Sequence, residues 1–282
     1  MRVRFWGVRG SVPTPGPSTV RYGGNTVCLE VRLADGTCIV LDAGTGLREL
    51  GKSLAAEHYK DRIHMFITHG HWDHILGLPF FGPVYSKDTT IMLHPTTQRG
   101  ISGMRTPIMF DTAHFPVAFH DLPATIELFE DLGVHRIGSA TVRHIELNHP
   151  GGATGFRIDD ADGTSVVYLT DNELAPPGEP KSTVEDLAKF SAGATLLIHD
   201  AQYLAGDMPA KRGWGHSTVN EVLELAKLAG CETIALHHHD PDRDDAALDA
   251  IGEMAQTWVS QNVPAMVSLI AREGLDLVLK RR

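Results

Sequence analysis

The chain has 282 residues, of which 42% are hydrophobic, and it contains no run of about eighteen apolar residues that could cross a membrane. Its cysteines, Cys28, Cys38 and Cys231, are too few and too widely spaced for a disulfide framework. A formal net charge of −10 disfavours a broad surface for long nucleic acid. Because no signal-peptide pattern is visible, we expect a cytoplasmic protein. The composition and the net charge together predict neither a membrane nor a long nucleic acid as a partner.

Short β-branched strands alternate with amphipathic helices along the chain. In the first half, the pattern predicts strands at 27–33 and 38–44 joined by a turn at Asp35-Gly36, a helix at 45–57 and a strand from 63 into a loop at 70. In the second half, it predicts strands at 139–150, 154–160, 165–171 and 194–201, a helix at 217–229, a strand at 233–238, a helix at 244–261 and a closing strand near 274–280. No repeat or linker divides the chain, so 1–282 is interpreted as one domain with two sheets and helices outside them.

One segment, about 95–132, lacks this regularity and is interpreted as an inserted lid or wall. Its apolar side chains would line a wall for a nucleobase, or would instead serve in internal packing or a dimer contact. They are Met104, Met109, Phe110, Phe115 and Phe119.

The densest chemical signal is ITHGHWDHILG at 67–77, which continues an apolar strand. It holds four metal-capable side chains within six positions: His69, His71, Asp73 and His74. A loop at a strand end has no fixed period, so the first two can face one metal ion and the last two another. A polar loop that is merely rich in histidine is the plainer alternative, but this pattern is far more specific than a single His-x-His pair.

The pattern resembles the HxHxDH signature of the metallo-β-lactamase-fold hydrolases, and the resemblance extends over nearly the whole chain. It is nearest to the phosphodiesterase branch that includes ribonuclease Z and the phosphonate-pathway phosphodiesterase. There, a ligand histidine precedes a Gly-aromatic-Arg strand, as His149 precedes Gly155-Phe156-Arg157, and an aspartate follows the next strand, as Asp171 does. The resemblance implies an α/β fold, a four-layer αββα sandwich of two mixed β-sheets flanked by helices, with a two-metal site along one edge.

The resemblance also implies a role for each ligand. One metal ion is expected at His69, His71 and His149, a second at Asp73 and His74, and Asp171 would bridge the two. Zinc is the expected metal, with manganese or iron as alternatives, because histidine-rich sites with one bridging carboxylate accept all three. Asp42 matches a position that orients the metal-binding loop.

Three consecutive histidines, at 237–239, follow a short apolar run. The family takes the last nitrogen ligand of the second metal from the end of a late strand, and His238 is the match. Along an extended strand end, residue 238 points to the opposite face from 237 and 239, so only one face can meet the site. His237 and His239 are left as neighbours that contact the substrate or pack.

Two further segments match the family, with Asp200 in LLIHDAQY and His216 in GHST. The resemblance implies that this pair protonates the leaving group, with the carboxylate orienting the imidazole. Together with Asp73 of the histidine-rich loop, Asp200 and His216 are the catalytic candidates. For Asp200 and His216, the alternative is a helix cap with a buried hydrogen bond. Lys211 and Arg212 would meet the phosphate or remain solvated loop charges.

The sequence predicts a small substrate. No long basic segment lies between Asp171 and His216 to match the protruding arm with which ribonuclease Z grips tRNA. We therefore expect a two-metal hydrolase of a small phosphodiester, with cAMP or cGMP as the concrete candidate. A lactone or carboxylic-ester hydrolase of the same fold and a metal-binding accessory protein without turnover are the alternatives, and a homodimer is left open.

Overall fold

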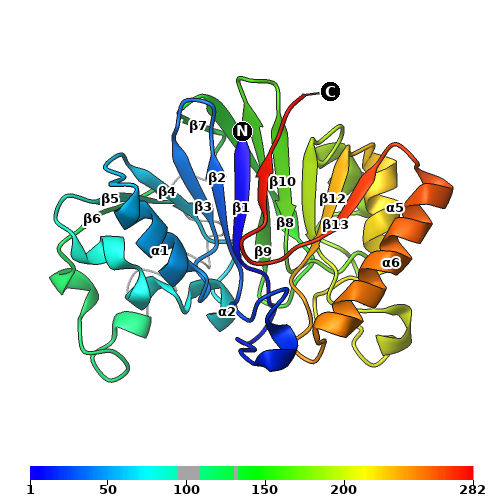
Figure 1. Ribbon diagram of the computed structural model, residues 1–282, viewed down its shortest axis with the longest axis horizontal. Coiled ribbons are helices and arrows are strands. Elements are labelled where there is room, and N and C mark those ends of the chain that lie inside the picture. The colour runs from blue at the N-terminus through cyan, green and yellow to red at the C-terminus, as the bar shows by residue number, and fades with distance from the viewer. Residues whose placement is uncertain (95–107, 130–132, 282) are drawn as a thin grey trace.

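The computed structural model describes residues 1–94, 108–129 and 133–281. Within these ranges, two mixed β-sheets of seven strands each face one another, and helices cover the outer face of each sheet (Figure 1). This confirms the four-layer αββα sandwich that the sequence resemblance implies.

The first sheet combines the N-terminal half of the chain with its last strand. In spatial order its strands are β14 (Asp276–Val278), β1 (Arg2–Gly7), β2 (Cys28–Arg32), β3 (Cys38–Leu41), β4 (Ile63–Phe66), β5 (Thr90–His94) and β6 (Thr125–Leu128). β1 pairs antiparallel with β14 and β2, β2 and β3 form the predicted hairpin, and β3 to β6 run parallel. Helix α1 (Leu47–Ala56) turns its leucines at 47, 50 and 54 inward, as their spacing predicts.

The second sheet holds the C-terminal half. Its strands are, in order, β13 (Val267–Ile270), β12 (Thr233–His237), β11 (Leu196–Asp200), β10 (Ser165–Leu169), β9 (Ala153–Asp160), β8 (Ala140–Leu147) and β7 (His135–Ile137). β10 to β13 run parallel, and β7 to β10 are antiparallel. Its outer helices are α4 (Val184–Phe190), α5 (Val219–Ala229) and α6 (Asp245–Asn262). No helix in the described ranges is both long and apolar enough to cross a membrane.

Short helical turns occupy several connections. They are α2 (Trp72–Ile75) and the 3₁₀ turns Pro17–Thr19, Leu78–Phe80, Gly82–Tyr85, Ile108–Phe110, Phe119–Asp121 and Ala205–Asp207.

Three apolar layers hold the sandwich together. The central layer lies between the sheets and includes Phe5, Leu29 and Phe156, all at most 2% exposed. The other two lie between each sheet and its helices. Since full burial of one such side chain contributes about 1.5–3 kcal/mol, these layers fix how the two sheets face each other.

The parallel strands determine where chemistry can occur. The carboxyl ends of β3, β4, β10, β11 and β12 lead into the polar segments singled out in the sequence. In Figure 1, α2 lies at one end of the sandwich, and the two chain ends lie at the opposite end. The predicted ligands therefore converge on one edge of the sheets.

The segment interpreted as an insert is partly regular. Residues 125–128 form β6, which pairs with β5 and so adds a strand to the first sheet, whereas the proposed boundary at 132 lies outside the described residues. Met109 and Phe110 are buried in the layer outside the first sheet, and Phe115 and Phe119 pack against it, so these side chains serve in packing rather than as a substrate wall. Met104 lies outside the described residues.

Candidate metal centre

The histidine-rich loop leads from β4 into the single turn of α2. His69 is 5% exposed, whereas His71 is exposed and occupies the position before the helix. Asp73 and His74 lie inside the turn and are buried. The two predicted pairs thus lie one before and one inside a helical turn, whereas the sequence predicts a loop without a fixed period for all four residues.

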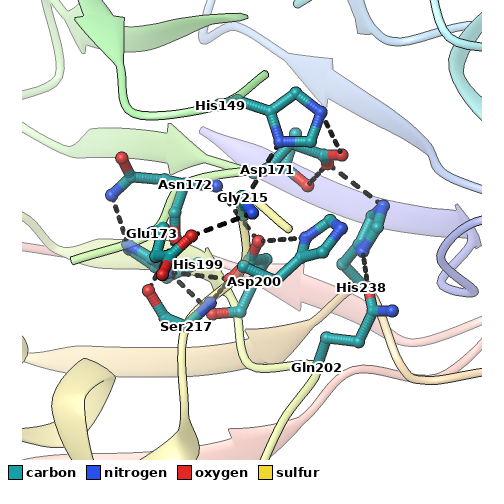
Figure 2. A network of polar contacts seen from close by, with 12 residues as sticks. His149, Asp171, Asn172, Glu173, His199, Asp200, Gln202, Gly215, Ser217 and His238 are labelled. Carbon is teal, nitrogen blue, oxygen red and sulfur yellow. Dashed lines mark hydrogen bonds and ion pairs between the residues drawn. The ribbon is translucent and has the colours of Figure 1, made fainter. Parts of the chain in front are cut away.

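Asp171 follows the end of β10 by two residues and lies at the centre of the site. Its side chain is 2% exposed, and each oxygen faces a different pair of imidazoles. Oδ2 lies 3.6 Å from Nε2 of His69 and 3.7 Å from Nε2 of His149. Oδ1 lies 3.2 Å from Nε2 of His74 and 3.0 Å from Nε2 of His238. Figure 2 shows His149 and His238 approaching this carboxylate from different sides.

Within the described residues, three sets of four side chains have all their potential ligand atoms within 4.8 Å of one another, and one of them joins Asp200 and His216 to Asp171 and His238. The other two sets are the candidate ligand groups. The groups are His69, His71, His149 and Asp171, and Asp73, His74, Asp171 and His238. They are the two sets that the sequence resemblance implies. Their role as metal ligands stays a prediction.

The chemistry of these groups fits divalent cations. The Nε2 atoms of His69 and His74 are buried and form no hydrogen bond with the described residues. Burial holds the pKa of His69 well below its usual value, which leaves the neutral imidazole that a metal requires. Burial would raise the pKa of Asp171, but the surrounding imidazoles, led by His238, lower it well below its usual range. A buried carboxylate and unpartnered nitrogens together fit a cation site.

Asp42 lies where the sequence resemblance places an orienting residue. It is fully buried behind His74, whose Nδ1 lies 2.9 Å from Oδ2. Its carboxylate also accepts hydrogen bonds from the Thr68 backbone N–H at 2.7 Å and the Tyr168 hydroxyl at 2.9 Å. A fixed hydrogen bond on Nδ1 leaves Nε2 of His74 pointing toward Asp73 and Asp171.

The three consecutive histidines have different surroundings. His238 faces the site, and its Nδ1 lies 2.9 Å from Oε1 of Gln202, as Figure 2 shows. His237 and His239 instead place Nε2 against backbone carbonyls of other segments, at 3.2 and 2.7 Å. Only the middle histidine reaches the candidate ligand groups, whereas its neighbours pack.

Asp200 and His216 form a pair beside these groups. Nδ1 of His216 lies 2.8 Å from Oδ2 of Asp200, whose carboxylate also accepts the backbone N–H groups of Asn172 and Ser217 at 3.1 and 3.0 Å. Burial alone would lower the pKa of His216, but the hydrogen bond and charge of Asp200 raise it above its ordinary value. The His216 ring stacks on His238 at 5.0 Å between centroids. The pair therefore adjoins the candidate ligands rather than lying apart as a helix cap.

Several residues near the site are not identified from sequence. Gln202 and Tyr168 contact predicted site residues, and the Ser11 backbone N–H donates to Oδ2 of Asp73 at 2.8 Å. Tyr168 faces inward by strand alternation, which is the one signal that could have indicated it. Trp72, inside the histidine-rich loop, is 54% exposed.

The two basic residues before His216 differ. Arg212 donates to the Ala175 carbonyl and lies 3.8 Å from Glu173, so it serves the loop. Nζ of Lys211 lies 4.5 Å from the centroid of the Trp214 ring, which is 57% exposed. Arg212 is exposed and Lys211 is half-buried, so accessibility alone does not separate the two predicted phosphate contacts.

The β-lactamase superfamily domain model matches residues 37–239, more than half of the chain. The chain belongs to the β-lactamase superfamily. Ribonuclease Z of Haloarcula marismortui is 27% identical, covering 84% of this chain and 86% of its own. Among solved structures, the metallo-β-lactamase fold protein YhfI from Bacillus subtilis has a TM-score of 0.70 at 21% identity, covering 98% of both chains. Zinc-bound PqqB from Methylobacterium extorquens has a TM-score of 0.69 at 16% identity, covering 99% of this chain and all of that one.

The superfamily membership and these relatives confirm the family and the fold predicted from the sequence. They identify this superfamily member as a metal-dependent hydrolase, the class of enzyme that the sequence predicts. The fold implies divalent metal ions, and the clustered histidines and aspartates fit them.

We predict that His238→Ala reduces bound zinc from two ions per chain to one, because the ligand group around Asp73 loses a nitrogen. His237→Ala is the matched control, since it removes a buried neighbouring imidazole that faces away from the site. Elemental analysis of the dialysed, zinc-loaded variants measures both. Two tightly held ions in His238→Ala would contradict the assignment.

Proposed function

We propose that this superfamily member is a two-metal hydrolase of a small phosphodiester, with a cyclic nucleotide as the concrete substrate. The observation that carries the proposal is the placement of Asp171 between two groups of imidazoles, with the Asp200–His216 pair beside them. A metal site alone suits many hydrolases, whereas a histidine–carboxylate pair next to it suits a leaving group that needs a proton.

The proposed ligands follow the two groups around Asp171. His69, His71 and His149 would hold one ion and Asp73, His74 and His238 the other, with Asp171 shared. Zinc is the first choice because imidazole nitrogens dominate both groups, and the zinc-bound PqqB structure supports it. When bound, two divalent cations would make hydroxide available at neutral pH and stabilise charge on the phosphoryl oxygens.

Hydrogen bonds would hold two of the catalytic candidates, His216 and Asp73, in place for this chemistry. Asp200 holds Nδ1 of His216, so Nε2 is the atom that would carry a proton to the leaving oxygen. Asp73, the remaining catalytic candidate, is fixed through Oδ2 by the Ser11 backbone N–H at 2.8 Å. Its carboxylate would therefore stay in place as the substrate enters.

The surface beside the site supports a substrate that carries an aromatic base. Trp214 is exposed, and it precedes Gly215, whose carbonyl contacts His149. Lys211 places its ammonium near the Trp214 ring. An aromatic face next to a cation suits a flat base and a phosphate, since both stacking and charge contribute to binding.

An RNA phosphodiester is the second candidate. It is supported by the similarity to the ribonuclease Z of Haloarcula marismortui over most of both chains. A formal net charge of −10 favours the small substrate, because long nucleic acid is bound mainly by neutralising its phosphates.

We predict that the zinc-loaded protein hydrolyses bis-p-nitrophenyl phosphate and cAMP or cGMP, because its proposed acid pair matches a phosphodiester. Steady-state rates are compared on these substrates, a structured tRNA precursor and an acyl-homoserine lactone. Metal-free protein and Asp171→Ala are the controls. Cleavage of the tRNA precursor alone would favour the second candidate, and lactone turnover without phosphodiester cleavage would overturn the proposal.

We also predict that His216→Ala lowers the rate about 10²–10⁴-fold on alkyl phosphodiesters but much less on nitrophenyl esters, because a good leaving group needs no proton. Zinc content measured on the same preparations should stay at the wild-type value. Equal losses on both classes of ester would refute the role of His216 as the acid.

A further inference from the structure

A buried carboxylate near the site lies outside both candidate ligand groups. Glu173 stands two residues after Asp171 and is 1% exposed. Its oxygens accept the backbone N–H of Gly213 at 2.9 and 3.0 Å and that of Gly215 at 3.0 Å. Figure 2 shows the Glu173 carboxylate beside Gly215. The carboxylate therefore holds both sides of the residue between them, Trp214.

The backbone of this loop requires glycine. Gly213 and Gly215 have φ of 85° and 87°, in the left-handed region that side chains rarely adopt. A Cβ on Gly215 would lie 2.1 Å from Nδ1 of His149. The loop can approach the histidine so closely only because it carries no side chain there.

The loop in turn contacts a predicted metal ligand. Nδ1 of His149 lies 3.0 Å from the carbonyl oxygen of Gly215, so Nδ1 donates this hydrogen bond. This leaves Nε2 directed toward His71 at 3.2 Å and Oδ2 of Asp171 at 3.7 Å. A continuous chain of hydrogen bonds thus runs from Glu173 through the loop to His149.

The backbone contacts outweigh the ionic contact of this carboxylate. The Nη1 atom of Arg212 lies 3.8 Å from Oε1 of Glu173, and it donates its hydrogen bond to the Ala175 carbonyl instead. Hydrogen bonds to an ionised acceptor are about twice as strong as neutral ones. Removing the charge should loosen the loop more than it disturbs the surrounding packing.

We propose that Glu173 is a positioning residue that clamps the 213–215 loop and thereby fixes the tautomer and direction of His149. The same clamp places Trp214 and, next along the chain, His216. The inference rests on the proposed function only in taking His149 as a ligand of a divalent cation. Ligand histidines depend on such outer hydrogen bonds for affinity.

The test is zinc binding to metal-free protein, followed by competition with a chromophoric chelator. Glu173→Gln keeps the shape of the side chain but removes its charge. We expect one of the two ions to bind about 10–100-fold more weakly and the other to stay within about twofold. Glu30→Gln is the matched control, because Glu30 is also buried, at 4% exposure, and bonds Trp6 away from the site.

Amide hydrogen exchange on metal-free wild-type protein tests the clamp without any substitution. The N–H groups of Gly213 and Gly215 should exchange much more slowly than that of Gly178 in an exposed loop. Equal exchange would refute the clamp even if Glu173→Gln fails to fold. Unchanged affinity for both ions in folded Glu173→Gln would also refute it, whereas failure of the wild type to bind two ions would refute the proposed function instead.

Discussion

The architecture of the site depends on one buried carboxylate, Asp171, whose charge has to be compensated inside the protein. Its side chain is only 2% exposed, and an uncompensated charge at such a position is strongly unfavourable. Imidazoles from separate parts of the chain approach both oxygens, and divalent cations held between them and the carboxylate would supply the compensation. These imidazoles belong to His69, His74, His149 and His238. Two sheets whose parallel strands end at the same edge can deliver all of them, which explains why this sandwich and this site occur together.

Left-handed backbone conformations occur at that edge of the sheets, next to the Asp171 carboxylate. Asp42, Asp171 and His238 have φ of 60°, 57° and 57°, and each lies within two residues of the end of its strand. Such conformations cost on the order of 1–3 kcal/mol each in residues other than glycine. They persist where the contacts of the surrounding structure hold the residue in place. At these positions Asp171 and His238 lie in the candidate ligand groups, and Asp42 lies behind His74. The apolar layers of the sandwich, which contain many fully buried side chains, stabilise the fold against this strain.

The sequence predicts local features well and distant ones only through family resemblance. The loop from His69 to His74 carries its own signal because its ligands lie within six positions, and the β2–β3 hairpin is likewise local. By contrast, β1 pairs with β14 at the other end of the chain. β5 shows no alternation because it is buried along most of its length, and β7 has only three residues. No local pattern connects Asp171 with His149, which are joined by folding alone. Glu173 is invisible to side-chain spacing because it acts through backbone N–H groups.

The central claim, that the Asp171 carboxylate is shared by two metal ions, is tested most directly by a crystal structure of the zinc-loaded protein with data collected at the zinc absorption edge. The account predicts two anomalous peaks per chain on either side of Asp171, one contacted by His69, His71 and His149 and the other by Asp73, His74 and His238. A single peak, or two peaks of which only one contacts Asp171, would contradict it.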